Sequence, residues 1–317
     1  MSTPSAKPAS GVRHQQVSRA EAGQRVDNYL LRVLKGVPRS RIYRILRKGE
    51  VRVNGKRIKP EYRLQAGDEV RLPPVRQAQA PKEAPQLPAG LDERLEAAIL
   101  AEDEYLMILD KPSGLAVHGG STLGFGVIEA LRAIRPNAPF LELAHRLDRA
   151  TSGCLVVAKT RAVLNELHGL LRDGKVEKHY LALLAGHWEG GPRRVELALS
   201  RGEGAAHSKV SVDEAGKAAS SLFTPKKRWP QATLADVRIF TGRTHQIRVH
   251  AAHIGHPVAG DEKYGDFDFN RTLRREGLKR LFLHASELRF QLPVSGRKYH
   301  VQAALPGDLK DFLKTFK

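Results

Sequence analysis

Two short segments near the N-terminus place apolar residues on one face of a helix. In the first, QRVDNYLLRVLKG, the apolar positions follow the 3.6-residue repeat: Val26, Tyr29, Leu30, Val33 and Leu34. In the second, RSRIYRILRKG, the same face carries Ile42, Ile45 and Leu46. A glycine follows each pattern, as is common at helix ends. The sequence therefore predicts two amphipathic helices in succession.

A β-hairpin is predicted directly after the second helix. Residues 50–59, EVRVNGKRIK, contain two short β-prone runs around Asn54 and Gly55. Asn-Gly favours the tight turn of a hairpin, because both residues tolerate the left-handed backbone region. Residues 66–73, AGDEVRLP, predict a further turn and strand.

The remaining two thirds of the chain predict one α+β domain. Apolar runs typical of strands occupy residues 105–114, 153–160, 179–188 and 232–240. Two helices are expected, over 161–174 after a Thr160 cap and over 245–255 after a Thr244 cap. Strands outnumber helices and do not alternate with them strictly, which argues against a doubly wound parallel sheet.

Polar and proline-rich stretches divide the chain. Residues 1–18 lack apolar periodicity and are expected to be a disordered tail, followed by a small domain over 19–75. Five prolines lie between positions 73 and 90, so residues 76–92 are expected to form a semi-rigid linker. The larger domain then covers 93–317.

Composition points to a polyanionic partner. The 317 residues carry a formal net charge of +19, and residues 24–76 contain 15 Lys and Arg against 5 Asp and Glu. The single cysteine, Cys154, excludes an intrachain disulfide and a multi-cysteine zinc site, and it is expected to be buried. The sequence has no candidate membrane span and no signal-peptide core, so we expect a cytoplasmic protein.

The basic residues of the small domain indicate RNA or DNA contact, because they line one side of a helix and continue through the hairpin. The stretch also resembles the alpha-L RNA-binding domain. That resemblance implies RNA contact by a set of residues: Arg39, Arg41, Arg44, Lys48, Arg52, Asn54 and Lys56.

Common catalytic and cofactor motifs are missing from the larger domain. HRLD at 145–148 differs from a kinase loop, and no Walker loop, dinucleotide-binding fingerprint or nucleophile elbow occurs. His245, His250, His253 and His256 cluster, but no carboxylate lies at ligand spacing between them. We therefore expect no metal site.

Three stretches with polar side chains remain as candidates for a catalytic site. HRLDRATSG carries Asp148, VEKHYLAL carries Tyr180, and TGRTHQIRVHAAHIGHPVAGDEKYG carries Arg243. Each residue alone has an ordinary structural explanation, as a turn cap, a core tyrosine or a surface arginine.

Together with ILDKPSGLAVHGG, these stretches resemble the RluA-type pseudouridine synthases over nearly the whole chain, from Gly23 to about Leu305. Ala150 departs from the Asp of many relatives, beside the motif. The resemblance implies a mostly antiparallel mixed sheet with flanking helices, preceded by the RNA-binding domain. It further implies isomerisation of uridine in large-subunit ribosomal RNA or its assembling particle, without a cofactor.

The resemblance also implies roles for four residues. Asp148 would stabilise or capture the anomeric carbon, and Arg243 would be its guanidinium partner, since a nearby guanidinium favours an ionised carboxylate. Tyr180 would stack on the uracil and assist loss of the proton from carbon 5. Arg146 would fill the space left by the extruded base. Nucleophilic attack by Asp148 and proton removal from the sugar both remain open.

Two other functions share these features. A ribosome-assembly factor could use the scaffold without catalysis, although it would not need all three candidate catalytic residues. A glycosidase that releases the base would use the same carboxylate. The sequence requires nothing larger than a monomer.

Overall fold

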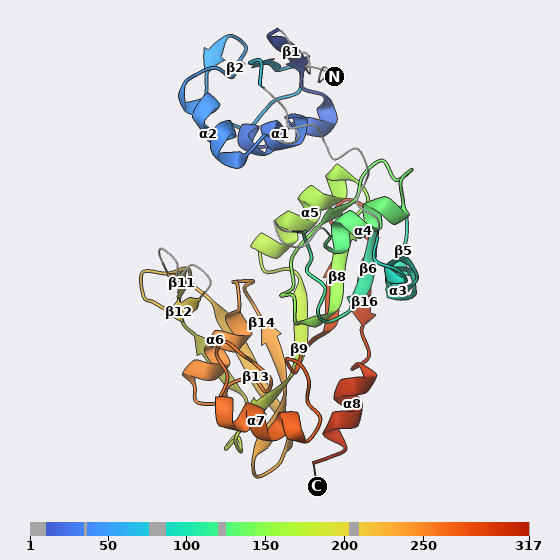
Figure 1. Cartoon of the computed structure of the whole chain (residues 1–317), viewed down its shortest axis with the longest axis vertical. Helices are drawn as coiled ribbons and strands as arrows, with labels where there is room; N and C mark the ends of the chain where they lie inside the picture. Colours follow the sequence, from blue (N-terminus) through green and yellow to red (C-terminus); the bar gives the residue numbers. More distant parts are fainter. Residues whose placement is uncertain (1–10, 35–36, 76–86, 120–124, 203–208, 317) are drawn as a thin grey trace, which may run out of the picture. The chain divides into compact units, whose positions relative to one another are not determined.

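A computed structural model of the chain describes residues 11–34, 37–75, 87–119, 125–202 and 209–316. The chain divides into two compact units, residues 1–86 and 87–317. Figure 1 shows the helices and strands of each unit.

The N-terminal unit combines a four-stranded antiparallel sheet with two helices. Its elements are β1 Arg13–Gln16, the 3-10 helix Arg19–Glu21, α1 Val26–Val33, α2 Arg39–Arg47, β2 Arg52–Val53, β3 Lys56–Arg57 and β4 Glu69–Leu72. The strand order is β1-β4-β2-β3. The apolar faces of α1 and α2 pack with the sheet in one core, including the fully buried Tyr29, Leu30, Ile42 and Ile45.

The predicted helices and hairpin of this unit are confirmed. Gly49 follows α2 with φ of +70°, the left-handed geometry in which a glycine ends a helix at little cost. Asn54 and Gly55 have φ of +49° and +74°, as a two-residue hairpin turn requires.

The prediction of a disordered tail over 1–18 is wrong for its second half. Residues 13–16 form β1, which pairs antiparallel with β4, and Val17 is buried in the core. All four β1 side chains are exposed, so the strand is held through its backbone and leaves no apolar pattern in the sequence. The rest of that prediction, residues 1–10, lies outside the described residues.

The C-terminal unit contains most of the elements. They are α3 Leu91–Ala97, β5 Ile99–Glu102, β6 Leu106–Lys111, α4 Val127–Ile134, β7 Glu142–Leu143, β8 Ser152–Ala158, α5 Arg161–Arg172, β9 Glu177–Ala185, β10 Arg193–Glu196, β11 Leu199–Arg201, β12 Val210–Val212, β13 Ser220–Arg228, β14 Ala232–Ile239, α6 Gln246–His253, α7 Phe267–Arg275, β15 Leu283–Gln291, β16 Lys298–Gln302 and α8 Gly307–Leu313.

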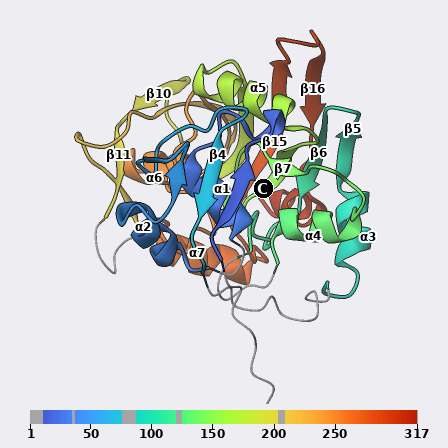
Figure 2. The same ribbon diagram turned by 90° about the horizontal axis from the view of Figure 1, so that it is seen from above.

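One long mixed sheet organises this unit. Its order is β10-β13-β14-β9-β15-β8-β6-β5, with β16 added to β15 and β7 to β8. Within the described residues, β15 and β8 form the parallel pair and the other neighbours are antiparallel. Figure 2 shows β10 and β5 toward opposite ends of the unit. The predicted α+β class and mostly antiparallel sheet are confirmed.

Both faces of the sheet are covered by helices. Along β6, Met107 and Leu109 join the core that contains α4, whereas Leu106 and Ile108 join the core that contains α5. A strand buried on both faces reads as a continuous apolar run, which is why β6 and β8 were predictable. Cys154 of β8 is fully buried, as expected.

The C-terminal unit begins earlier than the predicted boundary at residue 93. Leu87 packs against its core and α3 starts at Leu91, so residues 87–92 are not linker. The rest of the predicted linker, 76–86, lies outside the described residues.

Candidate active site

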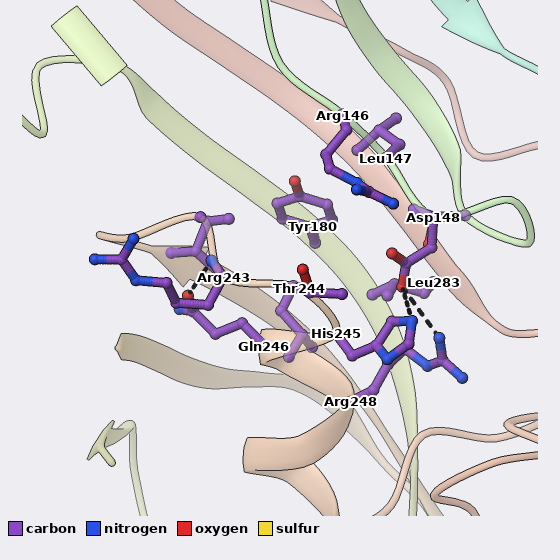
Figure 3. A pocket seen from close by; sticks show the side chains of 14 residues that line it. Arg146, Leu147, Asp148, Tyr180, Arg243, Thr244, His245, Gln246, Arg248 and Leu283 are labelled. Carbon is purple, nitrogen blue, oxygen red and sulfur yellow. Dashed lines mark hydrogen bonds and ion pairs between the residues drawn. The ribbon is translucent and has the colours of Figure 1, made fainter. Parts of the chain in front are cut away.

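Residues 144–151, between β7 and β8, form the loop that carries Asp148 (the Asp148 loop). A pocket of about 80 Å³ lies where this loop, β9 and the start of α6 meet. Figure 3 shows Asp148 and Arg146 on one side of the pocket and the segment 243–248 on the other. Tyr180, from β9, lies between them. The three stretches singled out in the sequence therefore line one pocket.

The Asp148 loop is held to the neighbouring strand β8. The backbone N–H of Val156 donates to Nε2 of His145 at 3.1 Å, and Val156 O accepts from the N–H of Ala144 at 2.9 Å. Leu147 is buried in the core between the exposed Arg146 and the partly buried Asp148. The apolar strand after the motif thus fixes the carboxylate in place.

His145 performs this task as a neutral ring. Burial lowers the pKa of His145 to about 4, and the nearby positive charge of Lys178 acts in the same direction. A protonated ring could not accept from Val156, because both ring nitrogens would then be donors.

The glycine of the TSG sequence, Gly153, is required by the backbone geometry at this position. Its φ is +108°, and a Cβ at this position would lie 2.2 Å from the carbonyl oxygen of Ala285. Gly153 thereby permits the close parallel pairing of β8 with β15 beside the pocket.

The guanidinium beside Asp148 belongs to Arg248, the third residue of α6. Its Nη1 donates to Oδ2 of Asp148 at 3.1 Å. Its Nε and Nη2 donate to Oδ2 and Oδ1 of Asp261 at 2.7 and 2.8 Å. One planar fork therefore joins a fully buried carboxylate to the partly exposed carboxylate of the pocket.

Arg248 and Asp261 stabilise each other's charged forms. Burial acts to raise the pKa of Asp261, but the hydrogen bonds and charge of Arg248 outweigh it and hold that pKa below its usual value. Burial likewise acts to lower the pKa of Arg248, and Asp261 and Asp148 more than compensate. Backbone N–H groups of Lys263 and Tyr264 complete the shell around Asp261.

His245 also faces Asp148. Its Nε2 lies 3.7 Å from Oδ2 of Asp148, and its Nδ1 lies 2.8 Å from the hydroxyl of Tyr264. The same hydroxyl accepts from the backbone N–H of Val210, so Tyr264 links His245 to β12.

The prediction that Arg243 pairs with Asp148 is wrong. Arg243 lines the pocket, but its Nε donates to the carbonyl of Ala218 at 3.1 Å, and Figure 3 shows its guanidinium directed away from Asp148. The backbone of Arg243 is held by the buried Gln246, whose Oε1 accepts from the backbone N–H of Arg243 and from the hydroxyl of Thr241.

The local fold beside Arg243 also differs from expectation. His245, rather than Thr244, is the N-cap of α6, and it has the left-handed φ of +56°. Such a φ is uncommon for a residue with a Cβ. This turn directs the guanidinium of Arg248 toward Asp148, whereas Arg243 lines the pocket with its guanidinium directed away from Asp148.

Tyr180 and Arg146 both line the pocket. Tyr180 is 8% exposed, and burial together with the negative charge of Asp148 raises the pKa of its phenol above the usual value. Arg146 is exposed, and Figure 3 shows its guanidinium near both Tyr180 and Asp148. Across the described residues, Arg146 makes no ion pair within 4 Å.

Lys111 anchors the Asp148 loop through hydrogen bonds, a role that the sequence analysis did not predict. Its fully buried ammonium donates to the carbonyls of Pro112, Leu115 and Arg149, the last of these directly after Asp148. Burial lowers the pKa of Lys111 to about 7.

The described part of the chain contains no group of three or more potential metal ligands. Of the clustered histidines, His250 is buried and bonded to Ser221 and to the carbonyl of Leu197. His256 lies 2.8 Å from the carbonyl oxygen of Ala185. These histidines serve packing and hydrogen bonding.

The six basic residues of the predicted RNA-binding set in the N-terminal unit divide into three groups. Arg41, Arg44, Lys48 and Lys56 are exposed. Arg52 is exposed but is within bonding distance of the carbonyls of Gly49 and Gly55. The side chain of Arg39 lies outside the described residues.

The side-chain amide of Asn54 is hydrogen-bonded within the unit and has a structural role. Its Nδ2 donates to Asp68 and its Oδ1 accepts from the N–H of Glu69, both at 2.8 Å. The amide therefore fastens the hairpin turn to β4.

Comparison with known proteins gives concordant results. A family model described as RNA pseudouridylate synthase matches residues 105–253, and one described as S4 domain matches residues 24–70. The chain is 53% identical over 300 residues to ribosomal large subunit pseudouridine synthase C of Pasteurella multocida (strain Pm70), covering 94% of this chain and 91% of that protein. It is 51% identical over 300 residues to the protein of the same name from Escherichia coli (strain K12), covering 94% of each.

A solved structure also matches. Human RNA pseudouridylate synthase domain containing 1 is 25% identical with a TM-score of 0.58, covering 71% of this chain and 90% of that one.

No helix in the described residues is long and apolar enough to cross a membrane.

Proposed function

The chain belongs to the RNA pseudouridine synthase family, and from this premise we propose that it converts specific uridines of large-subunit ribosomal RNA into pseudouridine, with Asp148 as the catalytic carboxylate. Two relatives more than half identical to it are named for the large ribosomal subunit, which supports this substrate. The observation that carries the catalytic assignment is the pairing of Asp148 with Arg248 inside the pocket.

The reaction exchanges two bonds of the anomeric carbon. The bond from C1′ to N1 of uracil breaks, the base turns, and a bond from C1′ to C5 forms. The proton on C5 leaves, and N1 ends protonated. A carboxylate at C1′ can stabilise the positive character of that carbon or capture it, and it can instead remove a proton from the sugar. All of these routes need an ionised Asp148.

Arg248 takes the role that the sequence suggested for Arg243. Its Nη1 donates to Asp148, and the two bonds to Asp261 prevent the guanidinium from turning away. The ring of His245 lies beside the same oxygen, with Nε2 3.7 Å from Oδ2 of Asp148.

Tyr180 and Arg146 would receive the base. The buried ring of Tyr180 offers a stacking surface for uracil. Its raised pKa keeps the phenol protonated, so the C5 proton would pass to a water that the Tyr180 hydroxyl positions rather than to a phenolate. The exposed Arg146 at the rim would fill the gap in the RNA stack.

The N-terminal unit would grip the RNA through its exposed basic residues: Arg41, Arg44, Lys48, Arg52 and Lys56. Arg39 belongs to the same proposed set. The binding partner would be large-subunit ribosomal RNA or its assembling particle. The protein would act in the cytoplasm as a monomer.

Tritium release tests the proposal. The protein is incubated with large-subunit rRNA labelled at C5 of uracil, and released label and nucleoside products are followed. Pseudouridine with tritium in water is the expected outcome. Free uracil would indicate a glycosidase, and intact uridine would indicate a binding protein.

The matched variant is Asp148→Asn, which keeps the size and removes the charge of the side chain. Turnover is expected to vanish, while affinity for the RNA stays within about threefold, because RNA affinity is dominated by phosphate contacts. Retention of a tenth of the activity would show that another carboxylate acts.

A further inference from the structure

A second hollow, of about 580 Å³, adjoins the catalytic pocket. Its wall is formed by β11, by the turn around Gly216 and by the corner Gly242, Arg243 and Thr244. These last three residues also line the catalytic pocket, so the two spaces share one wall. The hollow is much larger than the catalytic pocket.

The ionisable residues that line this hollow are all basic: Arg201, Lys217 and Arg243. All three are exposed. Their hydrogen bonds in the described structure go to neutral oxygens, with Arg201 Nη2 donating to Oγ1 of Thr244 at 3.0 Å and Arg243 Nε donating to the carbonyl of Ala218. Among the described residues that line the hollow, three are positively charged and none is a carboxylate.

These bonds hold the side chains in position without neutralising them. Each guanidinium keeps further N–H groups for a ligand, because a guanidinium has five. Lys217 is placed by its backbone, which pairs with Leu199 in an isolated bridge. A Cβ on Gly216 would lie 2.5 Å from the carbonyl carbon of Leu199, so this turn packs directly on β11.

We infer that this hollow binds backbone phosphates of the RNA strand next to the target uridine. The inference rests on the proposed function. A uridine that enters the catalytic pocket brings its flanking phosphates to the rim, and the shared wall 242–244 puts the basic hollow at that rim. Phosphate oxygens match the arginine fork, and the described residues that line the hollow include no acid that would repel them. Arg243 therefore has a binding task in place of the catalytic one suggested by the sequence.

Salt dependence of RNA binding tests the inference without requiring turnover. The Asp148→Asn protein is titrated with protein-free large-subunit rRNA at several KCl concentrations. Adding Lys217→Ala should reduce the slope of log affinity against log salt by about 0.7–0.9, and adding Arg243→Ala as well should roughly double that reduction. Lys217→Arg keeps the charge and should retain the slope.

Lys310→Ala is the matched control. Lys310 is an exposed lysine of α8, and Figure 1 shows α8 apart from β11 and β12. It should leave the slope unchanged. In the active background, Lys217→Ala should raise KM roughly threefold or more, with kcat within about twofold, because Lys217 does not reach the reacting atoms.

The outcomes separate the two proposals. Equal slopes and KM for Lys217→Ala and the parent protein would overturn the inference, as would an equal loss in Lys310→Ala. If the parent makes no pseudouridine but Lys217→Ala still lowers the slope, the proposed function fails and the phosphate site stands.

Discussion

Asp261 and Arg248 form a two-pronged ion pair, with Nε to Oδ2 at 2.7 Å and Nη2 to Oδ1 at 2.8 Å. The Asp261 side chain has no exposed surface, and the Arg248 side chain is 11% exposed. This pairing consumes two nitrogens of the guanidinium and directs the third, Nη1, at Asp148. The position of Arg248 beside Asp148 therefore depends on Asp261, which does not itself line the pocket.

Arg248→Lys is expected to lower kcat by roughly a hundredfold. A single ammonium cannot hold Asp261 with two bonds and still reach Asp148. Steady-state tritium release measures the effect, with Arg243→Lys as the matched control in the same stretch. The control should keep kcat within about threefold, and an equal loss in both variants would contradict the assignment of the partner.

Asp261→Asn is expected to lower kcat by about ten- to a hundredfold with little change in KM, because the freed guanidinium no longer faces Asp148 in one orientation. Loss of this buried partner should also lower the free energy of unfolding by about 3 kcal/mol. Circular dichroism must show the native fold before the rates are compared.

A double variant separates positioning from general damage. If Asp261 acts through Arg248, then Asp261→Asn with Arg248→Lys should be no slower than Arg248→Lys alone. Independent, multiplying losses would mean that Asp261 supports only the fold.

The stability of the C-terminal unit should depend on His145 below neutral pH. Its folded-state pKa of about 4 lies below the ordinary value of 6.5, so the unfolded chain binds the extra proton first. Stability is then lost as pH falls from about 6.5 to 4, by about 2–3 kcal/mol at pH 4.5.

Urea unfolding at pH 7 and 4.5 measures this loss. Both tryptophans, Trp188 and Trp229, lie in the C-terminal unit, so their fluorescence reports on it alone. His145→Gln keeps an acceptor for Val156 but does not titrate, and it should show a smaller loss between the two pH values. Equal losses would exclude His145 as the titrating group.

Deletion of residues 1–86 should leave the C-terminal unit folded, because the core of each unit consists of its own residues. RNA affinity should fall and its salt dependence should flatten. In the full chain, changing Arg41, Arg44 and Lys48 to alanine should reproduce about two to three units of the lost slope. An unchanged slope would show that the basic face does not contact RNA.

Asn54→Ala provides the contrast within the same unit. Both polar groups of Asn54 are used by Asp68 and Glu69, so the variant should lose about 1–2 kcal/mol of stability while the salt slope stays the same. A lowered slope would return Asn54 to the RNA-binding set.

The sequence alone determined the local elements and the chemistry to look for. Helical spacing predicted α1, α2 and α5, and continuous apolar runs predicted β6 and β8, because burial imposes a period on consecutive residues. The position of Asp148 on a turn before an apolar strand was also a local feature.

Only the tertiary structure decided which arginine meets Asp148 and where the N-terminal unit begins. Arg243 and Arg248 are five residues apart, and the choice between them follows from the turn held by Gln246 and the left-handed backbone of His245. Strand β1 is paired through backbone groups that every residue carries, so its side chains leave no pattern. Such choices depend on contacts between distant segments, which residue spacing does not encode.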